Sequence, residues 1–156
     1  EQVESCLISD DFNTLNSIDI EVCSLLQKKC SDHSFDALTA VQKLCLATFN
    51  AEGQIAGGGL FDFFQYTSDV EVLATLEAYE VFGAPDLLKL IQKAIKKFPK
   101  SPPLPDHSTR EEILDVWFDK DKDPFSKLDD KFHDIGSALR ERLKFVTVHP
   151  EHFFNS

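Results

Sequence analysis

The chain has 156 residues, 42% of them hydrophobic, which is enough for one sizeable core and excludes a chain disordered throughout. Its 27 acidic residues outnumber the 16 lysines and arginines, so the net charge is −11. A surface of that sign repels phosphate backbones, which argues against direct nucleic-acid binding and favours basic partners.

The first third of the chain holds all of the cysteines, Cys6, Cys23, Cys30 and Cys45. Their spacings match no metal ribbon and no redox pair, so we predict buried, reduced thiols. The sequence contains no run of about 18 apolar residues and no visible signal peptide at its start. We therefore expect a cytoplasmic protein without a membrane partner.

Helical patterns follow one another through the middle of the chain. Ser34 is predicted to cap a helix that ends at the three glycines 57–59, because glycine disfavours a helix interior. A short apolar element, 60–64, comes next. The sequence 68–71, Ser-Asp-Val-Glu, then predicts a capping box. The helix behind it is expected to end at Gly83 and to turn four residues towards the core: Leu73, Leu76, Tyr79 and Phe82.

The second half continues in the same way. Pro85 begins a lysine-rich helix that Pro99 ends, and residues 99–107 form a loop. The segment 109–112 predicts a second capping box, which opens a helix carrying Ile113, Leu114, Trp117 and Phe118. Two last helices follow a polar loop at 119–124, and only 145–148 could form a strand. The prediction is an all-α fold in a single domain, 1–156.

Residues that could carry chemistry lack the partners that chemistry requires. Asp119, Asp121, Asp123 and Asp130 have the spacing of a calcium loop, but Pro124 stands where that loop needs glycine. His149 and His152 lack a third ligand nearby, and no nucleophile or metalloprotease signature is present. We predict no metal, no cofactor and no enzymatic activity, and a small-molecule or enzymatic domain is the least favoured alternative.

The carboxylates are distributed in blocks. Residues 111–134 hold nine acidic and four basic residues, a net charge of −5. Glu111, Glu112 and Asp115 occupy neighbouring helix positions, where like charges about 5–6 Å apart repel. The neutral interpretation of this crowding is a solvated helix face, and the functional one is a binding surface.

Several motifs resemble those of a known family. The segment 57–64 reads Gly-Gly-Gly-Leu-Phe-Asp-Phe-Phe, and Phe-Gly-Ala follows at 82–84. Phe-Pro stands at 98–99 and Leu-Asp-Asp-Lys-Phe at 128–132. In this order the motifs resemble the acidic, all-helical DNA mimic protein 19-like family over 38–154. Gly57 and Leu60 depart from the Asn and Phe of that family, and 1–37 would be an N-terminal helical extension of the same domain.

The resemblance implies an acidic module that imitates DNA phosphates and occupies a basic DNA-binding protein such as a transcription factor, with a homodimer in at least one member. The phosphate-like carboxylates are predicted to be Glu111, Glu112, Asp115, Asp119, Asp121 and Asp123. A second choice is the set Asp10, Asp11, Asp19 and Glu21. The alternative function is a partner-specific inhibitor or immunity-type protein that acts by shape instead of charge.

Overall fold

The computed structural model describes residues 2–9, 11–101 and 103–154, and this part of the chain forms helices without any strand. The all-α prediction is therefore confirmed, and residues 145–148 belong to a helix. The α-helices are α1 (Gln2–Ser9), α2 (Phe12–His33), α3 (Ala40–Tyr66), α4 (Asp69–Phe82), α5 (Pro85–Ile95), α6 (His107–Asp119), α7 (Ser126–Ile135) and α8 (Leu139–Val148). Single 3₁₀ turns lie at Phe35–Ala37 and Pro150–His152.

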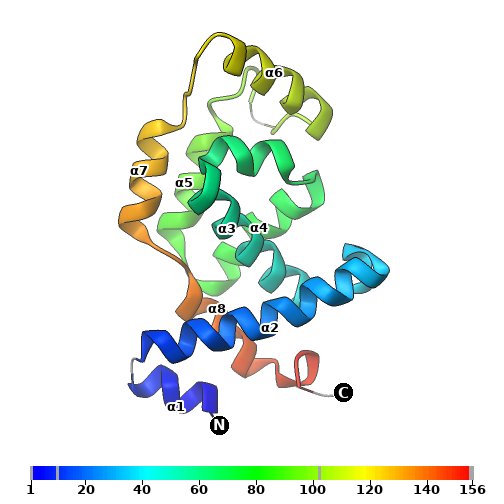
Figure 1. Cartoon of the computed structure of the whole chain (residues 1–156), viewed down its shortest axis with the longest axis vertical. Coiled ribbons are helices and arrows are strands. Elements are labelled where there is room, and N and C mark those ends of the chain that lie inside the picture. Colours follow the sequence, from blue (N-terminus) through cyan, green and yellow to red (C-terminus); the bar gives the residue numbers. More distant parts are fainter. Residues whose placement is uncertain (1, 10, 102, 155–156) are drawn as a thin grey trace.

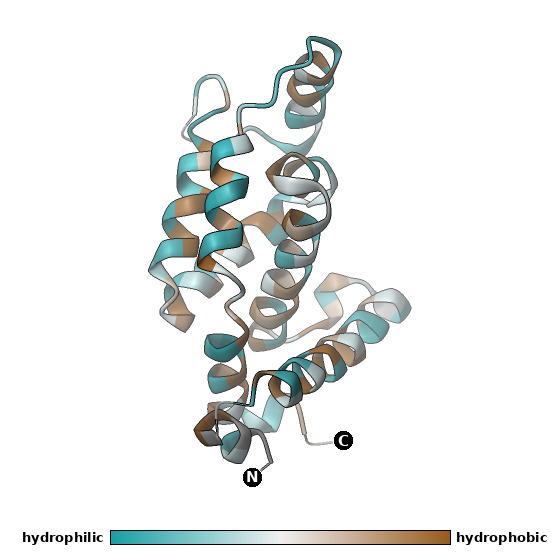
Figure 2. Cartoon of the chain, turned by 60° about the vertical axis from the view of Figure 1, so that its left-hand side comes forward, coloured by the Kyte–Doolittle hydropathy of each residue, from teal (hydrophilic) through white to brown (hydrophobic). Residues whose placement is uncertain are grey.

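The molecule is elongated, and its two ends are built from different parts of the chain (Figure 1). Helices α3–α7 pack around the largest hydrophobic cluster, and α6 lies at the far end of this bundle. Helices α1, α2 and α8 form the other end, near both termini, around two smaller clusters. Figure 2 shows hydrophilic residues along the outer faces of both parts.

The glycine segment does not end its helix as predicted; it kinks it. Helix α3 continues through Gly57 and Gly58, and only Gly59 leaves helical geometry, with a φ of 75°. Its left-handed conformation brings the backbone against Asp129 of α7, whose carboxylate accepts a hydrogen bond from the Leu60 amide at 2.8 Å. A Cβ on residue 59 would lie 2.6 Å from that carboxylate. The glycine motif and the 128–132 motif therefore meet in space.

The aromatic residues after this kink are core residues, in keeping with the apolar character of 60–64. Phe63 and Phe64 are fully buried, and Phe61 is partly buried against the same cluster. The Phe64 ring lies 5.1 Å from the ring of Phe98, which stacks on Trp117 of α6 at 5.4 Å. These contacts join α3 to the inner face of α6 near its C-terminal end.

Helix boundaries agree with the sequence in part. The capping box of Ser68 and Glu71 and the left-handed Gly83 at the end of α4 are confirmed. The predicted cap at Ser34 is wrong, because α3 begins later with a capping box formed by Thr39 and Gln42. The predicted core position of Leu73 is also wrong: its side chain is 63% exposed.

A buried charge cluster joins the N-terminal helices to the rest. Arg142 of α8 is 1% exposed and binds Asp19 of α2 through two hydrogen bonds, of 2.8 and 2.7 Å. The same guanidinium contacts Glu52 of α3 at 3.0 Å. Glu52 also accepts hydrogen bonds from the Tyr79 hydroxyl and the Ala138 amide. Burial opposes the charge of Arg142, but the two carboxylates hold its pKa well above the usual value.

The cysteines within the described side chains are free thiols, as predicted. Cys23 and Cys45 are buried and Cys30 is partly buried, whereas the side chain of Cys6 lies outside the described set. Burial raises the pKa of the Cys45 thiol to about 12, so this thiol stays protonated and unreactive at neutral pH.

Candidate functional site

Helix α6 carries most of the predicted carboxylates, and its start differs from the prediction. The capping box expected at 109–112 is wrong, because the helix begins earlier, at His107. Asp106 is the actual cap and accepts a hydrogen bond from the Thr109 amide at 2.9 Å. This hydrogen bond lowers the pKa of the Asp106 carboxyl. An aspartate in this position also favours the positive end of the helix dipole.

A buried arginine fixes α6 to the bundle. Arg110 is 0% exposed and donates hydrogen bonds to the carbonyls of Phe64 at 3.2 Å and Thr67 at 2.7 Å. It also donates to the Pro105 carbonyl at 2.9 Å and pairs with Asp69 at the start of α4. Sequence reasoning missed this residue, because nothing in its neighbourhood along the chain distinguishes it from a surface arginine.

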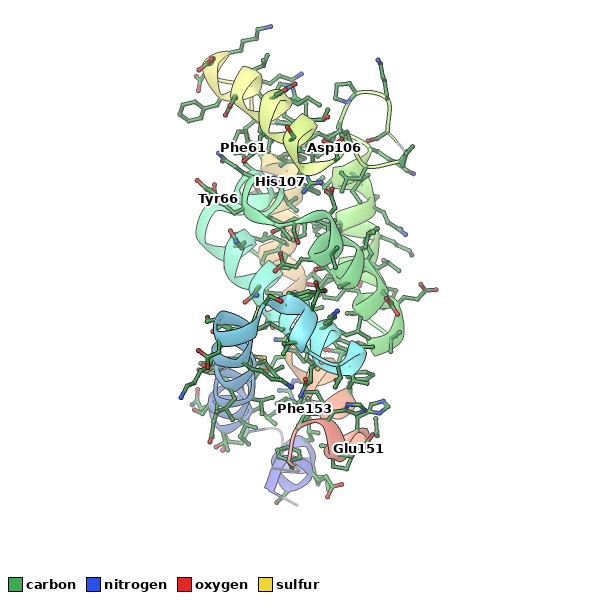
Figure 3. The ribbon with its side chains drawn as sticks, turned by 90° about the vertical axis from the view of Figure 1, so that its right-hand side faces the viewer. Phe61, Tyr66, Asp106, His107, Glu151 and Phe153 are labelled. Atoms are coloured by element: carbon green, nitrogen blue, oxygen red, sulfur yellow. The ribbon has the colours of Figure 1, made fainter. Side chains whose placement is uncertain are left out.

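A second anchor lies one turn earlier on the same helix. The His107 ring donates from Nε2 to the Gln65 carbonyl at 2.7 Å, and the His107 amide donates to Asp69 at 3.4 Å. Figure 3 shows Asp106 and His107 at the base of α6, beside the end of α3 that carries Tyr66. Helix α6 is thus held by polar contacts at its start and by Leu114 and Trp117 along its inner face.

The outer face of α6 and the loop behind it carry the predicted carboxylates. All six are exposed: Glu111, Glu112, Asp115, Asp119, Asp121 and Asp123. Glu112, Asp115 and Asp119 follow one another at helical spacing and form one ridge. In the described part of the chain, the only ion-pair contact of the six is between Glu111 and His107, at 3.8 Å. We call these six residues the acidic face.

The second-choice carboxylates do not form a comparable surface. Asp19 is 3% exposed and bound to Arg142, so the prediction that it meets a partner is wrong. Asp11 is exposed but caps α2 by accepting from Thr14, which lowers the pKa of its carboxyl. Glu21 is exposed, and Asp10 lies outside the described residues. Of the described three, Asp11 caps a helix, Asp19 is buried in an ion pair and Glu21 is exposed, so they do not form one surface.

A groove of about 660 Å³ lies at the opposite end of the molecule. Its walls are α2, with Val22 and Leu25, and the C-terminal segment, with Phe153 and Phe154. Lys29 stands at its edge and contacts Gln42 at 3.3 Å. Figure 3 places Glu151 and Phe153 at this end, far from His107.

Metal-binding geometry does not occur among the described residues: no group of three His, Cys, Asp or Glu side chains is arranged to hold an ion. Nor does any described helix combine the length and the apolar character that crossing a membrane requires.

The family model described as DMP19-like protein matches residues 36–148, and the chain belongs to this family. The matched region contains α3–α8, including the kink at Gly59 and the acidic face, whereas α1 and α2 precede it. Comparisons with curated proteins and with solved structures gave no match.

Proposed function

We propose that this DMP19-like protein is an acidic binding module whose acidic face imitates the DNA phosphate backbone and occupies a basic DNA-binding protein, such as a transcription factor. The observation that supports this is the exposure of six carboxylates on one helix and loop that buried contacts hold in place. Fixed charges lose less conformational freedom on binding than mobile ones.

The acidic face has the sign of charge that this role requires. Helix α6 has 13 residues and is therefore about 20 Å long. From Glu111 onward, this helix and the loop behind it hold six acidic and two basic residues in the segment 111–123, a net charge of −4. Duplex DNA carries one charge per roughly 1.7 Å, so the face is less dense than DNA but of the same sign. Repulsion between neighbouring carboxylates is relieved when cationic side chains cover them.

The proposed setting is cytoplasmic, and the proposed activity is binding and regulation without catalysis. Two copies of the chain would carry twice −11, a charge of −22. We include a homodimer in the proposal because it would extend the negative surface towards the length of an operator site. Light scattering of the purified protein at physiological salt measures this directly.

The test compares two variants with the same change in charge. Glu112→Gln, Asp115→Asn and Asp119→Asn together neutralise the ridge of the acidic face. The control triple, Asp32→Asn, Glu77→Gln and Glu80→Gln, neutralises exposed carboxylates of α2 and α4. Each protein is immobilised, a cell lysate from the source is passed over it, and bound proteins are eluted with salt or with duplex DNA.

We expect the wild type and the control triple to retain DNA-binding proteins that duplex DNA displaces, and the ridge triple to retain far less. Equal retention by both triples would contradict the proposal.

A second candidate function rests on the groove between α2 and the C-terminal segment. A partner-specific inhibitor or immunity-type protein would bury Leu25 and Phe154, which are 62% and 54% exposed, in such a complex. Apolar burial is not screened by salt. Retention of one protein through high salt, lost in Leu25→Asp but kept in the ridge triple, would favour this function.

A further inference from the structure

Two apolar side chains interrupt the acidic face. Phe118 is 75% exposed and Val116 is 48% exposed. Both belong to α6, whose inner face packs against the core. The neighbouring residues Leu114 and Trp117 are 0% and 7% exposed. The sequence placed both Trp117 and Phe118 in the apolar set of this helix, but only Trp117 is buried.

Helical spacing places these side chains beside the carboxylates. Phe118 follows Asp115 by three positions and Glu111 by seven, so the three share one stripe. Val116 follows Glu112 by four positions on the other side of the ridge. Each apolar side chain is thus bordered by carboxylates and does not belong to a separate patch.

The exposure of Phe118 is not explained by loose attachment of the helix. Arg110 and His107 fix the start of α6, and Trp117 stacks on Phe98 near its end. A single exposed phenylalanine is common on protein surfaces. An exposed aromatic residue beside carboxylates, on a helix anchored at its start, however, has the arrangement of an interface anchor with a polar rim.

We propose that the acidic face binds an amphipathic basic helix, whose arginines or lysines pair with the carboxylates while Phe118 enters a gap between its aliphatic side chains. This inference rests on the proposed function and specifies the partner: a basic segment that also exposes apolar side chains, not an extended polycation. The contact at Phe118 is one that DNA phosphates cannot reproduce, so it would separate the natural partner from other basic proteins.

The inference can be tested with two synthetic peptides of 18 residues that carry the same six arginines at the same positions. One peptide has leucine at the positions i, i+3, i+4 and i+7 between them, and the other has alanine there. Calorimetry measures their binding to the wild type, Phe118→Ala, Phe118→Leu and the ridge triple. Phe12→Ala serves as the matched control, because Phe12 is 55% exposed and begins α2, which lies at the opposite end of the molecule from α6 (Figure 1).

We expect the leucine peptide to bind about tenfold more weakly to Phe118→Ala than to the wild type, with an unchanged salt dependence. Phe118→Leu should retain most of the affinity, and Phe12→Ala should match the wild type. The alanine peptide should bind the wild type and Phe118→Ala equally. Because Phe118 is exposed, its variants should keep the thermal midpoint of the wild type, which calorimetric scanning checks.

The two proposals fail in different ways. Equal binding of the leucine peptide to Phe118→Ala and the wild type would overturn the inference about Phe118. Unchanged binding of both peptides to the ridge triple would instead contradict the proposed function.

Discussion

The two ends of the molecule each contain a fully buried arginine, and the arginines have opposite surroundings. Arg110 binds three backbone carbonyls and the half-exposed Asp69, so it fixes one helix to a chain junction. Arg142 lies between the buried carboxylates of Asp19 and Glu52, so it joins three helices through charge. The contacts of Arg110 fix the position of α6, which carries the acidic face. The contacts of Arg142 instead connect α2, α3 and α8 to one another.

The largest loss of stability is expected from removing the positive charge of Arg142. Arg142→Met leaves Asp19 and Glu52 buried without their counterion, which should lower the free energy of unfolding by about 3–5 kcal/mol. Asp19→Asn should lower it less, because Glu52 still pairs with Arg142. Urea denaturation of the three proteins measures both values. A loss below 1 kcal/mol in Arg142→Met would show that this cluster does not hold the helices together.

Removing the other arginine should affect stability less and binding more. Arg110→Ala orphans the carbonyls of Phe64 and Thr67, and we expect a loss of about 2–4 kcal/mol. Because α6 loses its anchor, the folded variant should also retain less DNA-binding protein than Asp69→Asn, which keeps the contacts to the carbonyls. Retention equal to that of the wild type would mean that the position of α6 does not matter for binding.

Two substitutions in the glycine segment should change the stability of the protein in opposite directions. Gly59→Ala forces a Cβ against Asp129 at a positive φ and should destabilise the protein by about 1–3 kcal/mol. At Gly57 the backbone is helical and nothing lies within 4 Å of an added Cβ. Gly57→Ala should therefore stabilise the protein by about 0.5–1 kcal/mol. Thermal melting compares the two, and equal shifts would refute the role assigned to Gly59.

The smallest expected effect is on how stability depends on pH, through the carboxyl group of Asp129. Burial raises the pKa of the Asp129 carboxyl above 3.8, although the hydrogen bond from Leu60 lowers it. The folded state therefore keeps this proton to higher pH than the unfolded chain, and the associated stabilisation is lost as pH rises through the raised pKa.

Asp129→Asn does not titrate, and its amide oxygen can still accept from Leu60. Its stability relative to the wild type should therefore increase between about pH 3 and neutral pH. Asp130→Asn, an exposed neighbour with the same change in charge, is the control in urea titrations. A relative stability of Asp129→Asn that stays constant over this range would contradict the raised pKa.

The sequence allowed the fold class, the box at Ser68 and the exposure of the acidic face to be predicted, because each depends on local spacing. It could not locate Arg110 or Arg142, since burial of a charge is decided by partners 41 to 123 positions away. The same reason explains Asp19, which has the local pattern of a surface residue but a buried counterion.

The local pattern of α6 was partly misleading, because it placed Trp117 and Phe118 together in one apolar set. Adjacent helix residues point in different directions, and Trp117 packs on Phe98 and Phe125 whereas Phe118 is exposed. Three successive glycines predicted a helix end. In the structure only Gly59 leaves helical geometry, with a left-handed φ, and Gly57 and Gly58 remain helical.

We propose that the acidic face takes the place of DNA on a DNA-binding protein. This proposal is tested most directly with the protein that the immobilised chain retains, bound to a fluorescent duplex and titrated with wild type, ridge triple or control triple. We expect the wild type and the control triple to displace the duplex at similar concentrations and the ridge triple to require at least about tenfold more. Displacement by the ridge triple at the wild-type concentration would contradict the proposal.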